Sequence, residues 1–91
     1  MHENDIARHV VDCCYKLHRQ YGPGIFEEVY EDLLVHELSK RELRCEQQII
    51  CPLIHDGLRF EKAYRLDILV DDKVILEVKS IEALLKRHFK Q

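Results

Sequence analysis

The first part of the chain has apolar residues at steps of three to four positions: Ile6, Val10, Cys13 or Cys14, and Leu17. This spacing places them on one face and predicts an amphipathic helix. Asn4 or Asp5 can accept hydrogen bonds from the free amide groups of the first turn and so begin the helix. The segment Tyr21-Gly22-Pro23-Gly24 ends it, because glycine and proline are the least favourable residues inside a helix.

A second helical pattern extends from about Ile25 to Arg41. Its apolar residues form a stripe that we expect to be buried: Phe26, Tyr30, Leu33, Leu34 and Leu38. At roughly 100° per residue, Glu27 falls at the edge of this stripe, whereas Glu28 and Asp32 point away from it. Glu27 is therefore expected to lean toward the rest of the fold. Glu28 is expected to be an ordinary acid of the first turn, where the helix dipole favours negative charge.

After the second helix, the pattern changes to short extended segments separated by turn residues. In chain order, the expected elements are a strand over residues 46–54, a hairpin turn at His55-Asp56-Gly57, strands over Leu58–Val70 and Val74–Val78, and a last helix over Ile81–Phe89. The order α-α-β-β-β-α predicts a single α+β domain over residues 1–91, with helices packed against an antiparallel sheet.

Burial decides the register of the second hairpin. The apolar residues of each strand share one face: Leu66, Ile68 and Val70, then Val74, Leu76 and Val78. Both sets lie on the same side of the sheet if the turn consists of residues 71–73, whereas a two-residue turn would put one set on each side. Val70 then pairs with Val74, and the next pair on that face joins Ile68 to Leu76.

This register brings charged residues together on the other face of the sheet. Asp67 stands directly opposite Glu77, and side chains in such a pair lie roughly 4.5 to 5.5 Å apart at Cβ. Lys79 follows two residues further along the same face, and Arg65 lies across from it. Two carboxylates this close need a cation or a shared proton between them.

Two kinds of arrangement satisfy this need. In a salt-bridge network, Arg65 and Lys79 neutralise the two carboxylates, which is the commoner arrangement in a small sheet. In a metal site, a divalent cation such as Mg²⁺ binds the carboxylate oxygens, water and a substrate phosphate. The nearby ammonium group would then position water or stabilise charge on the phosphate, and Glu27 would add a third carboxylate.

Composition restricts the class of protein further. The 91 residues, 46% of them apolar and 34% charged, are those of one small globular domain with a thin core. No apolar run approaches the roughly 20 residues of a membrane span, and the start MHENDIARHV is too polar for a signal peptide, so we expect a cytoplasmic protein without membrane contact. The four cysteines follow neither zinc-site nor CxxC spacing. Buried free thiols are expected, with a disulfide between helix and strand as the alternative.

The formal net charge of −3 provides no overall attraction to nucleic acid. Basic residues nevertheless gather at the C-terminal end: Lys79, Lys86, Arg87 and Lys90. Together with Arg65, they are candidates for contacts with phosphate groups. A solvated helix face also explains a basic run of this kind.

Three blocks of the chain resemble a known family. Asp67, followed after nine residues by Glu77-Val78-Lys79, is similar to the signature of PD-(D/E)XK nucleases. Gly24-Ile25-Phe26-Glu27-Glu28-Val29-Tyr30 matches the pattern GxxExxY, which names a prokaryotic family of that superfamily. Tyr64-Arg65-Leu66-Asp67 is similar to the second block of the family. The resemblance covers nearly the whole chain and implies an αβββαβ core with nuclease activity.

The resemblance also implies a role for each candidate site residue. Asp67 and Glu77 would bind Mg²⁺ or Mn²⁺, with the backbone carbonyl of Val78 as a further ligand. Glu27 would be the helix acid that many superfamily members add to the metal site. Lys79 would orient the attacking water or stabilise the pentavalent phosphate.

The family fold continues beyond the helix that follows the third strand, whereas this chain stops at Gln91. A C-terminal strand would then be lacking. Either a homodimer or higher oligomer forms, in which another copy covers the free edge, or the chain is a fragment of the family fold. Two functions therefore stand beside each other. One is a metal-dependent nuclease acting on DNA or RNA, and the other is a non-catalytic binding or assembly module on the same scaffold. A thiol-based redox protein or a zinc protein has no motif to support it.

Overall fold

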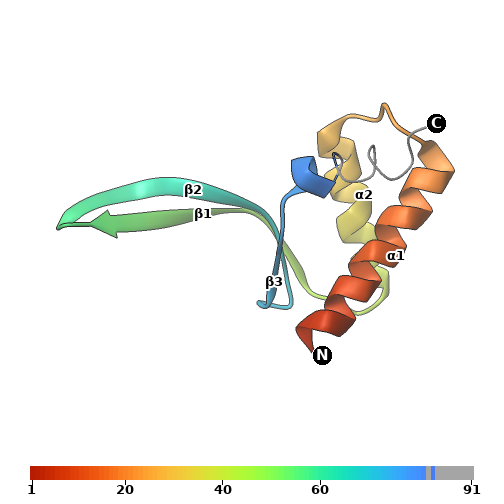
Figure 1. The fold of residues 1–91 in the computed structure, drawn as a ribbon, viewed down its shortest axis with the longest axis horizontal. Helices are drawn as coiled ribbons and strands as arrows, with labels where there is room; N and C mark the ends of the chain where they lie inside the picture. Colours follow the sequence, from red (N-terminus) through yellow and green to blue (C-terminus); the bar gives the residue numbers. More distant parts are fainter. Residues whose placement is uncertain (82, 84–91) are drawn as a thin grey trace.

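The computed structural model describes residues 1–81 and 83. Its elements are α1 (Glu3–Tyr21), α2 (Glu27–Lys40), β1 (Cys45–His55), β2 (Leu58–Val70) and β3 (Val74–Leu76). A short helical segment follows from residue 78. This order confirms the predicted α+β class, and Figure 1 shows both helices at one end of the sheet. Within the described part of the chain, no helix has the length and apolar character needed to cross a membrane.

The helix α1 ends where the sequence predicts, but it begins with a different cap. Asn4 and Asp5 already belong to the helix, and the Nδ1 atom of His2 accepts a hydrogen bond from the backbone N–H of Asn4 at 3.0 Å. At the other end, Gly22 has a φ of 67° and donates its N–H to the carbonyl of His18 at 2.8 Å. Glycine adopts such a conformation readily, so the helix stops here.

The helix α2 begins at Glu27, later than the periodicity predicts. Phe26 precedes it with an extended backbone, φ −62° and ψ 144°, and is 80% exposed. The prediction that Phe26 belongs to the buried stripe was wrong, because a residue ahead of the first turn does not follow the helical period. Tyr30, Leu34 and Leu38 are buried as predicted, and Leu33 is partly buried.

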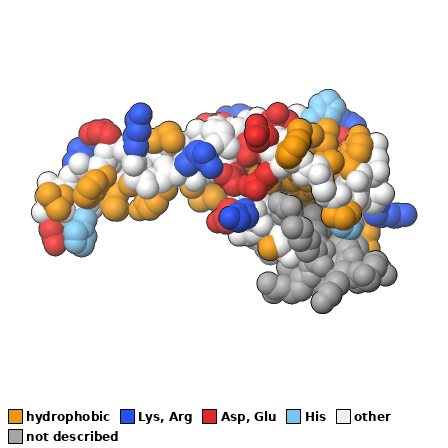
Figure 2. All heavy atoms as spheres, turned by 90° about the horizontal axis from the view of Figure 1, so that it is seen from above, with side chains coloured by type: hydrophobic (Ala, Val, Ile, Leu, Met, Phe, Trp, Pro, Cys, Tyr) orange, Lys and Arg blue, Asp and Glu red, His pale blue; other side chains and the backbone are white. Residues whose placement is uncertain are grey.

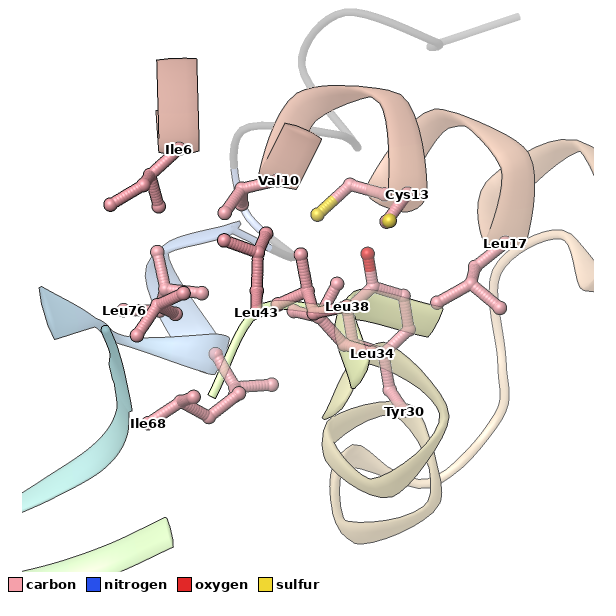
Figure 3. Packing of buried hydrophobic residues seen from close by; sticks show 13 residues of the cluster. Ile6, Val10, Cys13, Leu17, Tyr30, Leu34, Leu38, Leu43, Ile68 and Leu76 are labelled. Atoms are coloured by element: carbon pink, nitrogen blue, oxygen red, sulfur yellow. The ribbon is translucent and has the colours of Figure 1, made fainter. Parts of the chain in front are cut away.

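The hydrophobic core fills the space between α1, α2 and the sheet (Figure 3). Its side chains come from every element except β1: Ile6, Val10, Cys13, Cys14, Leu17, Tyr30, Leu34, Leu38, Leu43, Ile68, Val70, Leu76 and Val78. Burial raises the pKa of the Cys14 thiol, and a hydrogen bond with Tyr30 acts in the opposite direction. All four cysteines are free thiols, and Cys45 and Cys51 are only partly buried.

The sheet is antiparallel with the order β1-β2-β3. The β1–β2 turn has positive φ at Asp56 (49°) and Gly57 (79°), which is typical of the tight turns that fit the twist of a hairpin. The β2–β3 turn consists of residues 71–73, so Val70 pairs with Val74, and Ile68 with Leu76. The register predicted from burial is therefore confirmed over this hairpin.

The strand β3 ends at Leu76, two positions before the predicted end at Val78. From residue 78 the chain is helical, and the N–H of Ile81 donates to the carbonyl of Glu77 at 3.1 Å. Lys79 therefore lies in a helical turn, and the predicted position on a strand face across from Arg65 was wrong. Most of the predicted last helix, with Lys86, Arg87 and Lys90, lies outside the described residues.

The outer part of the β1–β2 hairpin projects from the helices as a two-stranded arm (Figure 1). The arm gives the molecule extents of 49 × 29 × 20 Å. It carries exposed large apolar side chains on both strands: Ile50, Leu53, Ile54, Leu58, Phe60 and Tyr64. The core thus supports only the base of this hairpin.

A candidate acidic site between the second helix and the sheet

A pocket of about 560 Å³ opens where the first turns of α2 approach the base of the arm. We call it the acidic pocket; its lining residues are Glu27, Glu28, Glu31, Asp32, Gln47, Gln48, Arg65 and Asp67. Figure 2 shows acidic side chains gathered where the arm meets the helices. The structure therefore brings Glu27 and Asp67, which are far apart in the sequence, to one pocket.

Asp67 joins the acidic pocket to the segment that follows β3. Its Oδ2 atom accepts a hydrogen bond from the backbone N–H of Val78 at 2.9 Å, and its side chain is 14% exposed. The N–H groups of the first helical turn have no partner within the helix, and a carboxylate there is favoured by the helix dipole. Asp67 thus holds the beginning of the helical segment against β2.

Glu77 immediately precedes the residue whose amide Asp67 binds. It is exposed, and its Oε1 atom accepts a hydrogen bond from the Ser80 hydroxyl at 2.8 Å. Lys79 is also exposed, in the first turn of the helical segment. Glu77 and Lys79 thus flank the residue whose amide Asp67 binds, but neither of them lines the acidic pocket.

The salt-bridge network expected from the sequence is present only in part. Arg65 Nη2 lies 3.8 Å from Asp67 Oδ1, with the Arg65 side chain largely in solvent. Among the ion pairs of residues 1–81 and 83, none joins Lys79 to Asp67 or to Glu77. Because the pair is long and its cation is exposed, its contribution to stability is small.

Glu31 is a member of the acidic pocket that the sequence does not reveal. It is 8% exposed, and its carboxylate accepts hydrogen bonds from Gln47 Nε2 at 2.9 Å and from Gln48 Nε2 at 2.9 and 3.0 Å. The signal for it was weak: Glu31 lies one turn after Glu27 on the same helix face.

Glu28 and Asp32, which the periodicity places away from the apolar stripe of α2, are exposed and also line the acidic pocket. Gln47 Nε2 donates to Asp32 Oδ1 at 3.0 Å. The apolar stripe of α2 packs on the core, and the neighbouring acidic face of the helix lies next to β1. The long side chains of Gln47 and Gln48 in β1 reach this face and donate hydrogen bonds to it.

Gln48 has a φ of 55°, a left-handed conformation that is uncommon for a residue with a side chain. The β1–β2 ladder pairs Gln47 with Ile68 and then Ile49 with Leu66, so Gln48 and Asp67 face each other without forming a regular pair. Such backbone conformations cost of order 1–3 kcal/mol. Hydrogen bonds to a charged group contribute about 1.5–3 kcal/mol each, so those with Glu31 can offset this cost.

The donors of the acidic pocket suit a hard divalent cation, because carboxylate oxygens are the ligands that Mg²⁺ prefers in proteins. Their arrangement is less complete. Within residues 1–81 and 83, no three His, Cys, Asp or Glu side chains are grouped to hold one ion. One oxygen of Asp67 is also engaged by the Val78 amide. The pocket therefore offers the right donor atoms without a preassembled metal centre.

Two helices ahead of an antiparallel three-stranded sheet, with acids where α2 meets β2, form an α+β fold that is consistent with a PD-(D/E)XK-like domain. The chain belongs to the PD-(D/E)XK nuclease superfamily, whose family model matches residues 4–91. No curated protein and no solved structure matches the chain. Members of this superfamily typically depend on a metal ion.

Proposed function

We propose that this protein is a metal-dependent nuclease of the GxxExxY family that hydrolyses phosphodiester bonds in DNA or RNA. The observation that supports it best is the contact between Asp67 Oδ2 and the Val78 amide. This contact ties the Glu77-Val78-Lys79 segment to the pocket that Glu27 lines. The proposal is supported by this link between β2 and the segment after β3, and by the presence of Glu27 and Asp67 in the same pocket.

Each candidate residue has a role that its chemistry allows. Asp67, Glu77, Glu27 and the Val78 carbonyl are the oxygen donors that would hold Mg²⁺ or Mn²⁺, which would neutralise charge on the scissile phosphate. Lys79, exposed and cationic, would hold the attacking water or stabilise negative charge as it develops on phosphate. Arg65 stands at the pocket rim and would contact the nucleic-acid backbone.

The test is a cleavage assay on plasmid, linear double-stranded DNA, single-stranded DNA and RNA with Mg²⁺ or Mn²⁺. We expect Asp67→Asn, Glu77→Ala and Lys79→Ala each to lower the rate by roughly 100-fold or more, as loss of a general acid–base or charge-stabilising group does. Glu42→Ala and Lys73→Ala remove exposed charges outside the pocket and serve as matched controls.

Calorimetry with Mn²⁺ distinguishes loss of metal binding from loss of the cleavage step. The nuclease is supported if only the wild type cleaves and if Asp67→Asn no longer binds Mn²⁺. A wild type that neither cleaves any of the four substrates nor binds Mn²⁺ contradicts it.

A second candidate function, a non-catalytic assembly module, is favoured by the apolar arm. The partner we propose is a second copy of this chain, giving a homodimer or higher oligomer through the same surface on each copy. Leu53 and Phe60 are a cross-strand pair and are both exposed. Light scattering coupled to size-exclusion chromatography tests this, and a stable monomer of 10.9 kDa contradicts it.

A further inference from the structure

We infer that Glu31 is a positioning residue: its buried carboxylate fixes the backbone of Gln48 and thereby sets where Asp67 stands in the acidic pocket. The effect on catalysis rests on the nuclease function proposed above. The effect on the local backbone does not depend on that function.

Two neighbouring glutamines of β1 reach the one carboxylate of Glu31. In a regular strand, adjacent side chains point to opposite faces, so Gln47 and Gln48 could not both contact Glu31. Both do, through their Nε2 atoms at 2.9 to 3.0 Å. The positive φ of Gln48 is the local change that turns its side chain to the helix.

The pairing between β1 and β2 lacks a regular pair at Gln48. Pairing is regular on both sides, with Gln47 opposite Ile68 and Ile49 opposite Leu66, but it is interrupted between them. Asp67 is the residue of β2 at this interruption. The side chain of Asp67 accepts the amide of Val78, which follows β3 on the other side of β2.

The Glu31 carboxylate depends on the same hydrogen bonds. Glu31 is 8% exposed, and none of the ion pairs among the described residues includes it. A buried carboxylate needs hydrogen-bond donors in place of water. The two glutamine amides supply them, so Glu31 and the irregular backbone at Gln48 stabilise each other.

The test is Glu31→Gln, which keeps the size of the side chain but replaces one acceptor oxygen by an NH₂ group. We expect the backbone amide and Cα NMR signals of Gln48 and Asp67 to shift. We also expect the cleavage rate to fall roughly 10- to 100-fold, as for other groups that orient a metal ligand, with less change in KM. Glu37→Gln is the matched control, because Glu37 is on the same helix but binds Lys16 and Lys40 away from the pocket.

The second variant, Gln48→Gly, is combined with Glu31→Gln. Glycine adopts positive φ without strain, so it should restore the Asp67 signals and most of the activity if Glu31 acts through the backbone of residue 48. No recovery in the double variant, or Gln48 and Asp67 signals unchanged in Glu31→Gln, overturns the inference.

If Glu31→Gln does not fold, Gln48→Met removes the Nε2 donor of residue 48, while Gln47 still donates to Glu31. This variant should move the same Asp67 signals, and unmoved signals overturn the inference. If the wild type cleaves nothing, the proposed nuclease fails while the NMR comparison still decides the role of Glu31.

Discussion

At the scale of single residues, stability depends on a few fully buried side chains. Leu34 and Leu38 of α2 have no exposed surface and face the buried side chains of α1 (Figure 3). Protein interiors are close-packed, so the loss of even a few carbon atoms leaves a cavity that the surroundings fill only partly. The core of the described residues is small, so it has few such positions to spare.

Leu34→Ala is therefore expected to lower the free energy of unfolding by about 2–5 kcal/mol. The control is Val11→Ala on the outer face of α1, where the side chain is exposed and the change should stay within about 0.5 kcal/mol. Urea unfolding followed by circular dichroism measures both. Equal midpoints for the two variants would show that α2 is not part of the core.

At the scale of elements, α1 and α2 are joined by charge as well as by apolar packing. Lys16 Nζ of α1 lies 2.8 Å from Glu37 Oε1 of α2, and Lys40 lies 3.2 Å from Oε2. The hydrogen bond from Lys16, with a smaller contribution from Lys40, lowers the pKa of the Glu37 carboxyl. Folding therefore favours the ionised form of Glu37.

The sign of the pH dependence follows from that lowered pKa. The stabilisation is fully present above the unfolded pKa of about 4.3 and is lost as the pH falls through the lower folded value. Glu37→Gln should thus melt below the wild type at pH 7, with a small difference because the pair lies near the surface. In thermal melts, the difference should shrink as the pH falls and disappear once the pH is well below the folded pKa. A gap that persists in acid would exclude the ion pair as its cause.

At the scale of the whole molecule, the arm is the least supported part. A two-stranded ribbon alone is marginally stable in water, and this one extends past the helices with apolar side chains on both strands (Figure 1). Pro52 interrupts the outer edge of β1, where the register also shifts, so the edge is poorly suited to pairing with a further strand. The exposed side chains, rather than the edge, are the surface that contact with another copy would cover.

Replacing the exposed pair, Leu53→Ser with Phe60→Ser, should therefore weaken self-association by at least about tenfold while leaving the helical core intact. Ala63→Ser on the same arm is the control, since it removes little apolar surface. Sedimentation or light scattering over a concentration series measures the change. An unaltered oligomer in the double variant would place the contact elsewhere.

Much of the fold follows from local pattern. Apolar residues at helical spacing predict α1, which ends at Tyr21 in the structure as expected. The extended pattern predicts a strand over Leu58–Val70, and β2 has these bounds. The alternation of apolar residues also fixed the pairing of Val70 with Val74, because a slip by one residue would expose a whole strand face. The candidate residues Glu27 and Asp67 came from motif and register together.

Local spacing sets the periodicity of each element and the apolar face that it buries, because these depend on neighbours a few residues away. The burial of Glu31, the left-handed backbone of Gln48 and the hydrogen bond from the Val78 amide to Asp67 have no such local origin. These features depend on how closely α2 and the segment after β3 approach the sheet. That approach is set by packing between distant parts of the chain, which no local spacing records.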